Sequence, residues 1–339
     1  MGVWLVGCGA GWRRARWAGL LALLWLASSP ASAHDATTMT PEEIRGRARQ
    51  LILALDDAPR LAALAPAGKP LGELARALAA LPEVRELVHL RPYSTEETLR
   101  RLAIEARAPR PERETLVAAL VLSLEESDVR GALPGLLALG RAWPEGAPYV
   151  PPFTTQALLA LCRDGGQQPV SYRFPRGELA RALELGRKAA RERTEELVAS
   201  FASSDLSLRW VGSSGPNTLR ATLERDAEVI ELSLLAAFAP EPLLARFEHP
   251  EADLARDYEL SALAYALELG EAKAAIPALA HFATGPDRGY LFAPLFATRA
   301  LAVLSGQEDP NPAYHVYTPE QMRSLAERAL ARWPAKPGG

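Results

Sequence analysis

Two segments of this 339-residue chain repeat each other without a gap, 143 positions apart. Residues 119–136 (ALVLSLEESDVRGALPGL) align with residues 262–279 (ALAYALELGEAKAAIPAL), and 7 of the 18 aligned positions are identical. Each copy passes from a stretch rich in Ala and Leu, through a short polar break, into a stretch that contains proline. This pattern is typical of a helix–corner–helix unit that buries its apolar face against neighbouring units. We therefore expect the chain to be a stack of helices.

The residues at the break predict how the unit turns. Gly270 is expected to allow a left-handed end to the first helix. An acid follows in both copies, Asp128 or Glu271, where the positive N-terminus of the second helix would favour its charge. Pro134 and Pro277 are expected to lie one turn into that helix and to bend it, because each removes a backbone hydrogen bond.

The rest of the chain also favours helices. Ala, Leu, Glu and Arg, which are strong helix formers, dominate the composition. Residues 40–43 (TPEE), 94–97 (STEE) and 318–321 (TPEQ) each have the pattern of a capping box and predict three helix starts. The predicted fold class is all-α, an α-α superhelix or an irregular array of helical repeats.

One region allows two interpretations. Residues 206–210 alternate between apolar and polar residues like a strand, and residues 212–217 suit a hairpin turn. The apolar residues from Leu219 to Phe238, however, recur at three- and four-residue spacing. We expect one helix from about Asn217, although a hairpin over residues 206–224 remains the alternative.

The N-terminal segment has the pattern of a secretory leader. Three arginines, at positions 13, 14 and 16, precede an apolar run over residues 17–27, which is shorter than the about 20 residues that span a bilayer. Ala31-Ser32-Ala33 matches a signal-peptidase site, so a Sec-type signal peptide over residues 1–33 and cleavage after Ala33 are predicted. Residues 34–339 then form a single helical-repeat domain that is periplasmic or secreted.

Removal of the leader changes the charge and the cysteine content. The remaining chain has 35 basic and 41 acidic residues, a net charge of −6, and this gives no reason to expect a nucleic-acid partner. Cys162 becomes the only thiol, so no internal disulfide can form. No second apolar run is long enough to span a membrane, and no membrane span is expected after the leader is removed.

The corner of the repeat resembles that of bacterial HEAT-like helical repeats. The resemblance rests on Ala266–Leu279, with an acid after the glycine and an Ile-Pro pair, and on the final helix that ends near Trp333. It is limited to about residues 115–140 and 253–333. It implies a right-handed stack of antiparallel helix pairs, usually serving as a protein-binding surface. It implies no catalytic residues.

Three loops are expected to interrupt the helices, at residues 143–153, 163–176 and 307–317. Insertions in repeat arrays emerge at one face, often the binding face. Aromatic side chains concentrated in these loops can anchor a partner, or they can fill the edge of the core beneath the loops. The candidate binding residues are Tyr149, Phe153, Tyr172, Phe174, Tyr314, His315 and Tyr317.

Catalytic patterns are weak. The five histidines show no metal-ligand spacing, so neither a metal site nor a cofactor is predicted. Cys162 follows an apolar stretch and is expected to be a small buried hydrophobe. The sequence favours a scaffold or binding protein of the cell envelope with a protein or other macromolecule as partner. The alternative is an enzyme acting on envelope glycans or peptides in a pocket under the three loops, with Glu308, Asp309 and His315 as an acid–base set.

Overall fold

The computed structural model describes twelve stretches and single residues of the chain. They are residues 39–66, 69–144, 146–162, 172, 174, 177–202, 210, 213, 215–248, 254–285, 289–311 and 316–333. The predicted leader, residues 1–33, lies outside these residues.

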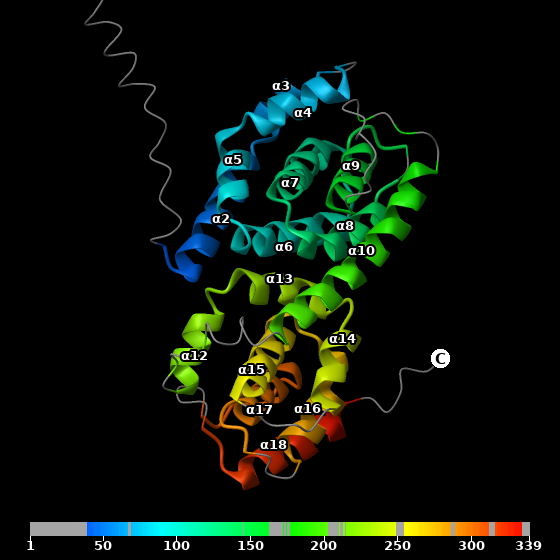
Figure 1. Cartoon of the computed structure of the whole chain (residues 1–339). Helices are drawn as coiled ribbons and strands as arrows, with labels where there is room; N and C mark the ends of the chain where they lie inside the picture. The colour runs from blue at the N-terminus through cyan, green and yellow to red at the C-terminus, as the bar shows by residue number, and fades with distance from the viewer. Residues whose placement is uncertain are drawn as a thin grey trace, which may run out of the picture. The chain divides into compact units, whose positions relative to one another are not determined.

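The described residues form sixteen α-helices and no β-strand, so the predicted all-α class is confirmed (Figure 1). The first eight helices are α2 (Pro41–Leu55), α3 (Ala58–Leu64), α4 (Leu71–Ala79), α5 (Pro82–His89), α6 (Tyr93–Arg107), α7 (Glu114–Ser127), α8 (Leu133–Ala142) and α9 (Val150–Cys162). The second eight are α10 (Glu178–Phe201), α12 (Pro216–Leu223), α13 (Ala227–Ala236), α14 (Glu241–Leu244), α15 (Leu254–Leu269), α16 (Ile276–Ala283), α17 (Ala293–Leu304) and α18 (Pro319–Arg332). Short 3-10 turns are η1 (Pro111–Arg113), η2 (Arg130–Ala132), η4 (Ala245–Glu248) and η5 (Lys273–Ala275).

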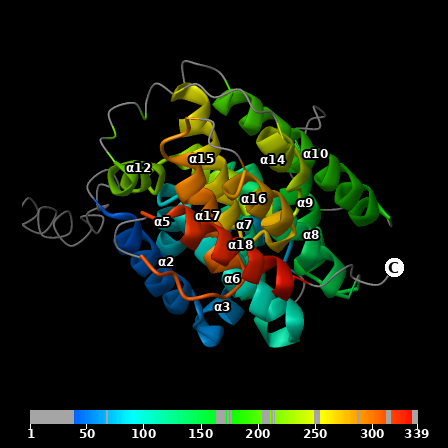
Figure 2. The same cartoon turned by 90° about the horizontal axis from the view of Figure 1, so that it is seen from below.

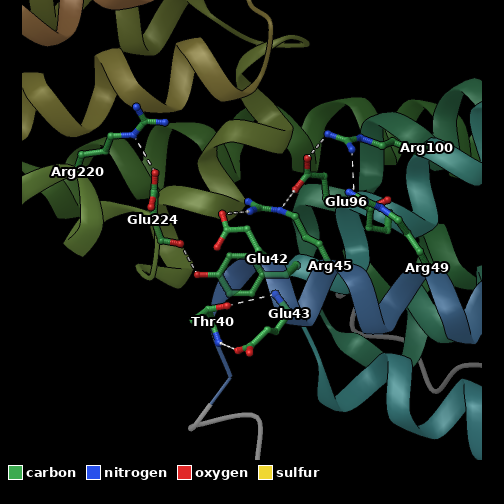
Figure 3. Close-up of polar contacts among 11 residues, drawn as sticks. Thr40, Glu42, Glu43, Arg45, Arg49, Glu96, Arg100, Arg220 and Glu224 are labelled. Atoms are coloured by element: carbon green, nitrogen blue, oxygen red, sulfur yellow. Dashed lines mark hydrogen bonds and ion pairs between the residues drawn. The ribbon is translucent and has the colours of Figure 1, made fainter. Parts of the chain in front are cut away.

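Two of the three predicted capping boxes are present. The Thr40 hydroxyl accepts the backbone N–H of Glu43, whose carboxylate accepts the backbone N–H of Thr40 (Figure 3). Thr318 and Gln321 form the same reciprocal pair at the start of α18. The prediction at residues 94–97 is wrong, because α6 begins at Tyr93 and the buried Ser94 hydroxyl donates to the carbonyl of Leu87. In this case a contact with the preceding helix replaces a local cap.

The two self-similar segments adopt the same backbone conformation. Helix α7 ends before Asp128, which has φ 53°, and helix α15 ends before Glu271, which has φ 51°. A 3-10 turn follows in each, η2 or η5, and then α8 or α16 begins, again 143 residues apart. The local sequence therefore specifies the same helix–corner–helix geometry at both places.

The residues of the corner act differently from their predicted roles. The left-handed residue is the acid, Asp128 or Glu271, and not Gly270. Gly270 is needed for close packing instead, since a Cβ atom there would lie 2.3 Å from the backbone oxygen of Ser233. Pro134 and Pro277 are the second residues of α8 and α16. A proline at this position removes no hydrogen bond from within the helix, so the predicted cause of a bend is absent.

Helices α7 and α15 form the centres of two packed groups. In α7 the residues from Leu116 to Leu124 are all buried, and in α15 the residues from Tyr258 to Glu268 are buried. A helix that is buried on every side needs neighbours all around it. Helix α7 contacts α4, α5, α6 and α9, whereas α15 contacts α12, α13 and α17 (Figure 1). Figure 2 shows α16, α17 and α18 gathered together, in agreement with their mutual contacts.

Helix α13 joins the two corners. A Cβ atom at Gly131, in η2, would lie 3.0 Å from the backbone oxygen of Glu231. Gly270, at the end of α15, approaches Ser233 and Ala236 of the same helix. The two glycines therefore let α13 pack closely against both self-similar segments.

The expected single helix from Asn217 to Phe238 is two helices, α12 and α13. Asp226 separates them, because its carboxylate accepts the backbone N–H groups of Glu228 and Val229 and so begins a new helix. Residues 206–209 and 211 lie outside the described residues. Trp210 is buried, and its indole N–H donates to the carboxylate of Asp226 at 3.1 Å.

Salt bridges connect helices that are distant in the sequence. Glu96 of α6 accepts from Arg45 of α2 at 2.9 Å (Figure 3). A hydrogen bond also joins α6 to the residue after α12, because the hydroxyl of Tyr93 donates to the carbonyl of Glu224. None of the helices in the described part of the chain has the length and apolarity required to cross a bilayer.

Candidate functional site

The first two predicted loops meet in the structure. Phe153 is buried in the first turn of α9, and its ring centroid lies 4.6 Å from that of Tyr172, with 30° between the ring planes. Tyr149 is half-buried, and its hydroxyl donates to the carbonyl of Ala65 at 3.4 Å. Phe174 is also half-buried. These contacts agree better with aromatics that fill the edge of the core than with anchors open to a partner.

The described part of the third loop lies elsewhere. Tyr317 packs with Ala302 of α17 and Leu325 of α18, and its hydroxyl donates to both carboxylate oxygens of Asp309 at 3.0 Å. Figure 1 shows α18 at the opposite side of the helical array from α9. Tyr314 and His315, also predicted as site residues, lie outside the described residues. The described aromatics of the three loops therefore do not gather in one site.

Asp309 and Glu268 form a buried charge network around Arg299. The Arg299 guanidinium donates to Glu268 and to Asp309, both at 3.1 Å. Burial raises the pKa of the Glu268 carboxyl, and the neighbouring Arg299 opposes this shift. Burial also raises the pKa of Tyr317. Because Asp309 bridges Arg299 and Tyr317, its carboxylate holds the loop against α17, which is a structural role and not that of an open acid or base.

Glu125 is a second unusual carboxyl group, at the end of α7 below the first two loops. The side-chain amide of Gln156 donates to it at 3.3 Å, and Tyr172 lies close by. Burial raises the pKa of Glu125 to about 7. Cys162, the last residue of α9, is half-buried, and the sequence prediction of a buried thiol is therefore only partly right.

A pocket that the sequence did not predict lies between η4, α16, α17 and α18. Its volume is about 510 Å³, within the roughly 300–1,000 Å³ that ligand pockets usually have. One wall consists of three aromatic rings in series, with the ring of Phe282 in contact with each of the other two. Phe247 and Phe282 lie 5.1 Å apart at their centroids, and Phe282 and Tyr290 lie 5.5 Å apart. Leu295 and Met322 also line the pocket and pack on the buried cluster around Tyr317.

The first turn of α15 positions two sides of this pocket. The buried carboxylate of Asp257 accepts the backbone N–H groups of Leu291, Phe292 and Ala293 at 2.7–3.1 Å, and so it caps the N-terminus of α17 from another helix. Two residues later, Glu259 accepts from Arg246 at 2.7 Å and thereby holds η4. Both the wall residue Phe247 and the mouth residue Leu291 are thus fixed by neighbouring positions of α15.

The mouth of the pocket is both apolar and charged. Leu291 lines it and is 64% exposed. Glu248, His281 and Arg323 are exposed and also line the pocket. Arg323 pairs with Glu320 at 3.6 Å. A pocket of this kind can bind an apolar group inside and interact with a charged group of the same ligand at its rim.

Sequence reasoning missed this pocket because its wall residues are far apart in the chain. Phe247, Phe282 and Tyr290 lie in three separate segments, and none of these segments has a recognisable motif. The one sequence signal is the cluster Tyr290-Leu291-Phe292 directly before α17, which places three large apolar residues outside a helix. Within the described residues, no group of three His, Cys, Asp or Glu side chains is placed to hold a metal ion.

No protein-family model, curated protein or solved structure matches this chain.

Proposed function

We propose that this chain is an exported helical scaffold, built from HEAT-like units, that binds another protein or macromolecule of the cell envelope. The observation that carries the proposal is the apolar pocket of about 510 Å³ between η4, α16, α17 and α18, with Leu291 exposed at its mouth. Exposed apolar surface next to a formed cavity is a feature of interaction sites. The Arg-rich, apolar and Ala-Ser-Ala pattern of residues 1–33 supports export.

Partner binding is tested by a photo-crosslinking amino acid placed at position 291 of the full chain in its native cells. We expect discrete crosslinked adducts of higher mass on irradiation. The matched control places the same crosslinker at Leu53 in α2, which is 67% exposed and lies in a helix that does not line the pocket. An absence of adducts at 291, or the same adducts at both positions, contradicts the proposal.

Export is tested by the mass of the N-terminal peptide of the protein recovered from those cells. Cleavage after Ala33 predicts that His34 becomes the first residue. An Ala33→Arg variant is expected to keep the leader, because signal peptidase requires a small residue at that position. Recovery of an uncleaved native chain in the cytoplasm would show that the localisation is wrong, whatever the result of the crosslinking.

A further inference from the structure

The interior of the C-terminal pocket suits one bulky apolar side chain. Its wall is the ring series Phe247, Phe282 and Tyr290, and its lining includes Leu295 and the adaptable thioether side chain of Met322. A volume of about 510 Å³ accommodates an aromatic or large aliphatic side chain together with part of its backbone. Aromatic anchors in such pockets supply much of the affinity at protein interfaces.

The rim charges favour a basic neighbour for that side chain. Arg323 already has a carboxylate partner, Glu320, at 3.6 Å. Glu248 lines the pocket, and within the described part of the chain it forms no ion pair. An uncompensated carboxylate at the mouth attracts a lysine or arginine and disfavours the carboxylate of a fatty acid or another acidic ligand.

Building on the binding role proposed above, we propose that the pocket formed by η4, α16, α17 and α18 binds a peptide segment of a partner protein. One aromatic or large aliphatic side chain of the segment enters against Phe247, Phe282 and Tyr290. Its backbone covers Leu291, and an adjacent lysine or arginine faces Glu248. Asp257 and Glu259 hold the walls in place, so the pocket is formed before the peptide arrives.

The partner chemistry is tested with a phage-displayed library of random dodecapeptides. The full mature chain is the target, and the Leu291→Asn variant serves to deplete clones that bind elsewhere. We expect the selected clones to share an aromatic or large aliphatic residue next to lysine or arginine. A synthetic peptide of the consensus sequence is then titrated by fluorescence anisotropy. The absence of enriched clones, or a consensus without either feature, overturns the proposal.

Matched variants locate the binding. Leu291→Asn is expected to weaken the consensus peptide at least tenfold, whereas Leu53→Asn, at a nearly equal exposure of 67%, leaves the affinity within twofold. Glu248→Gln is expected to reduce at least fivefold the preference for peptides with a basic over an acidic residue beside the apolar anchor. The anchor itself should still bind. Equal effects of the two leucine variants would place the binding outside the pocket.

The outcomes separate this proposal from the broader one. If the crosslinked adducts at position 291 form but the consensus peptide does not compete with them, the scaffold role stands and the peptide chemistry is wrong. If a fatty-acid or glycan probe displaces the peptide from the pocket with higher affinity, the class of ligand is wrong. If no adducts form at all, the scaffold role itself fails.

Discussion

Asp128 and Glu271 have the same left-handed backbone conformation, with φ angles of 53° and 51°, at equivalent positions of two segments 143 residues apart. For residues other than glycine, this conformation costs about 1–2 kcal/mol of stability, although Asp tolerates it better than most. At Glu271 the helix end is closed by the N–H of Ala272 donating to Leu267 at 3.1 Å. The corner therefore requires a left-handed residue at this position, and glycine would adopt that conformation more easily than either acid.

A Glu271→Gly substitution is expected to stabilise the protein by about 0.5–1 kcal/mol. The relief of left-handed strain exceeds the greater freedom that glycine gives the unfolded chain. Asp128→Gly should gain less, because Asp tolerates the conformation better. Urea unfolding of the full chain measures both changes. The control is Gly306→Ala, at φ 63°, which should destabilise. A loss of stability in Glu271→Gly would mean that its side chain, and not its backbone, is what the corner requires.

A Gly270→Ala substitution is expected to destabilise the protein by about 2–3 kcal/mol. The added Cβ atom would lie 2.3 Å from the backbone oxygen of Ser233, and neither backbone can move without disturbing α13. Gly46→Ala in α2 is the matched control, because no atom lies within 4 Å of its added Cβ. It should stabilise by about 0.5–1 kcal/mol through helix propensity. Similar midpoints for both variants in urea would contradict the close packing of α13 against the corner.

The ionisation of Glu125 is expected to make the folded state less stable at higher pH. Its pKa rises from an ordinary 4.5 to about 7 on folding. Between these values the folded protein keeps a proton that the unfolded chain releases, so this contribution to stability is complete below pH 4.5 and is lost as the pH rises through 7. The loss is at most about 3 kcal/mol by the pKa difference.

The substitution Glu125→Gln tests this directly. At pH 5 the variant should unfold at nearly the same urea concentration as the natural chain, because the amide resembles the protonated carboxyl. At pH 8 the variant should be the more stable of the two. Glu327→Gln, at an exposed position of α18, serves as the control and should leave the pH dependence unchanged. A parallel pH profile for the natural chain and Glu125→Gln would show that Glu125 titrates normally.

The parts of the fold that sequence reasoning predicted depend on local interactions. The caps at Thr40 and Thr318, and the repeated corner, are set by residues within a few positions of one another. The wrong cap at Ser94 and the missed break at Asp226 show the limit of such reasoning. The Ser94 hydroxyl binds the preceding helix, while the apolar spacing continues past Asp226 as though one helix ran through it.

The candidate site could not be predicted from the sequence because it also depends on contacts between distant residues. The three predicted loops contain aromatic residues, but the described ones face their own local cores, as the Phe153–Tyr172 and Tyr317–Asp309 contacts illustrate. The pocket instead depends on Asp257, a buried acid inside a helix that carries no motif. Its partners are backbone N–H groups 34–36 residues away, and a backbone partner leaves no trace in the sequence.

Asp257 is therefore expected to control both stability and the shape of the pocket. Removing its carboxylate leaves the N–H groups of Leu291, Phe292 and Ala293 without acceptors near the N-terminus of α17. Hydrogen bonds to a charged group contribute about 1.5–3 kcal/mol, so Asp257→Ala should lose about 3–4 kcal/mol and Asp257→Asn about 1–2 kcal/mol. Hydrogen exchange measured by mass spectrometry over residues 289–295 should accelerate in the order natural chain, Asn, Ala.

Global destabilisation alone would also speed up exchange, and Asp226→Ala provides the comparison. It removes the cap of α13 and the acceptor of the buried Trp210 indole N–H, with an expected loss of about 2–3 kcal/mol, without touching α17. At a temperature where all variants remain folded, residues 289–295 should exchange faster only in the Asp257 variants, because only these open the mouth of the pocket locally. Equal acceleration in Asp226→Ala would mean that this segment opens only through global unfolding and that Asp257 does not hold the pocket.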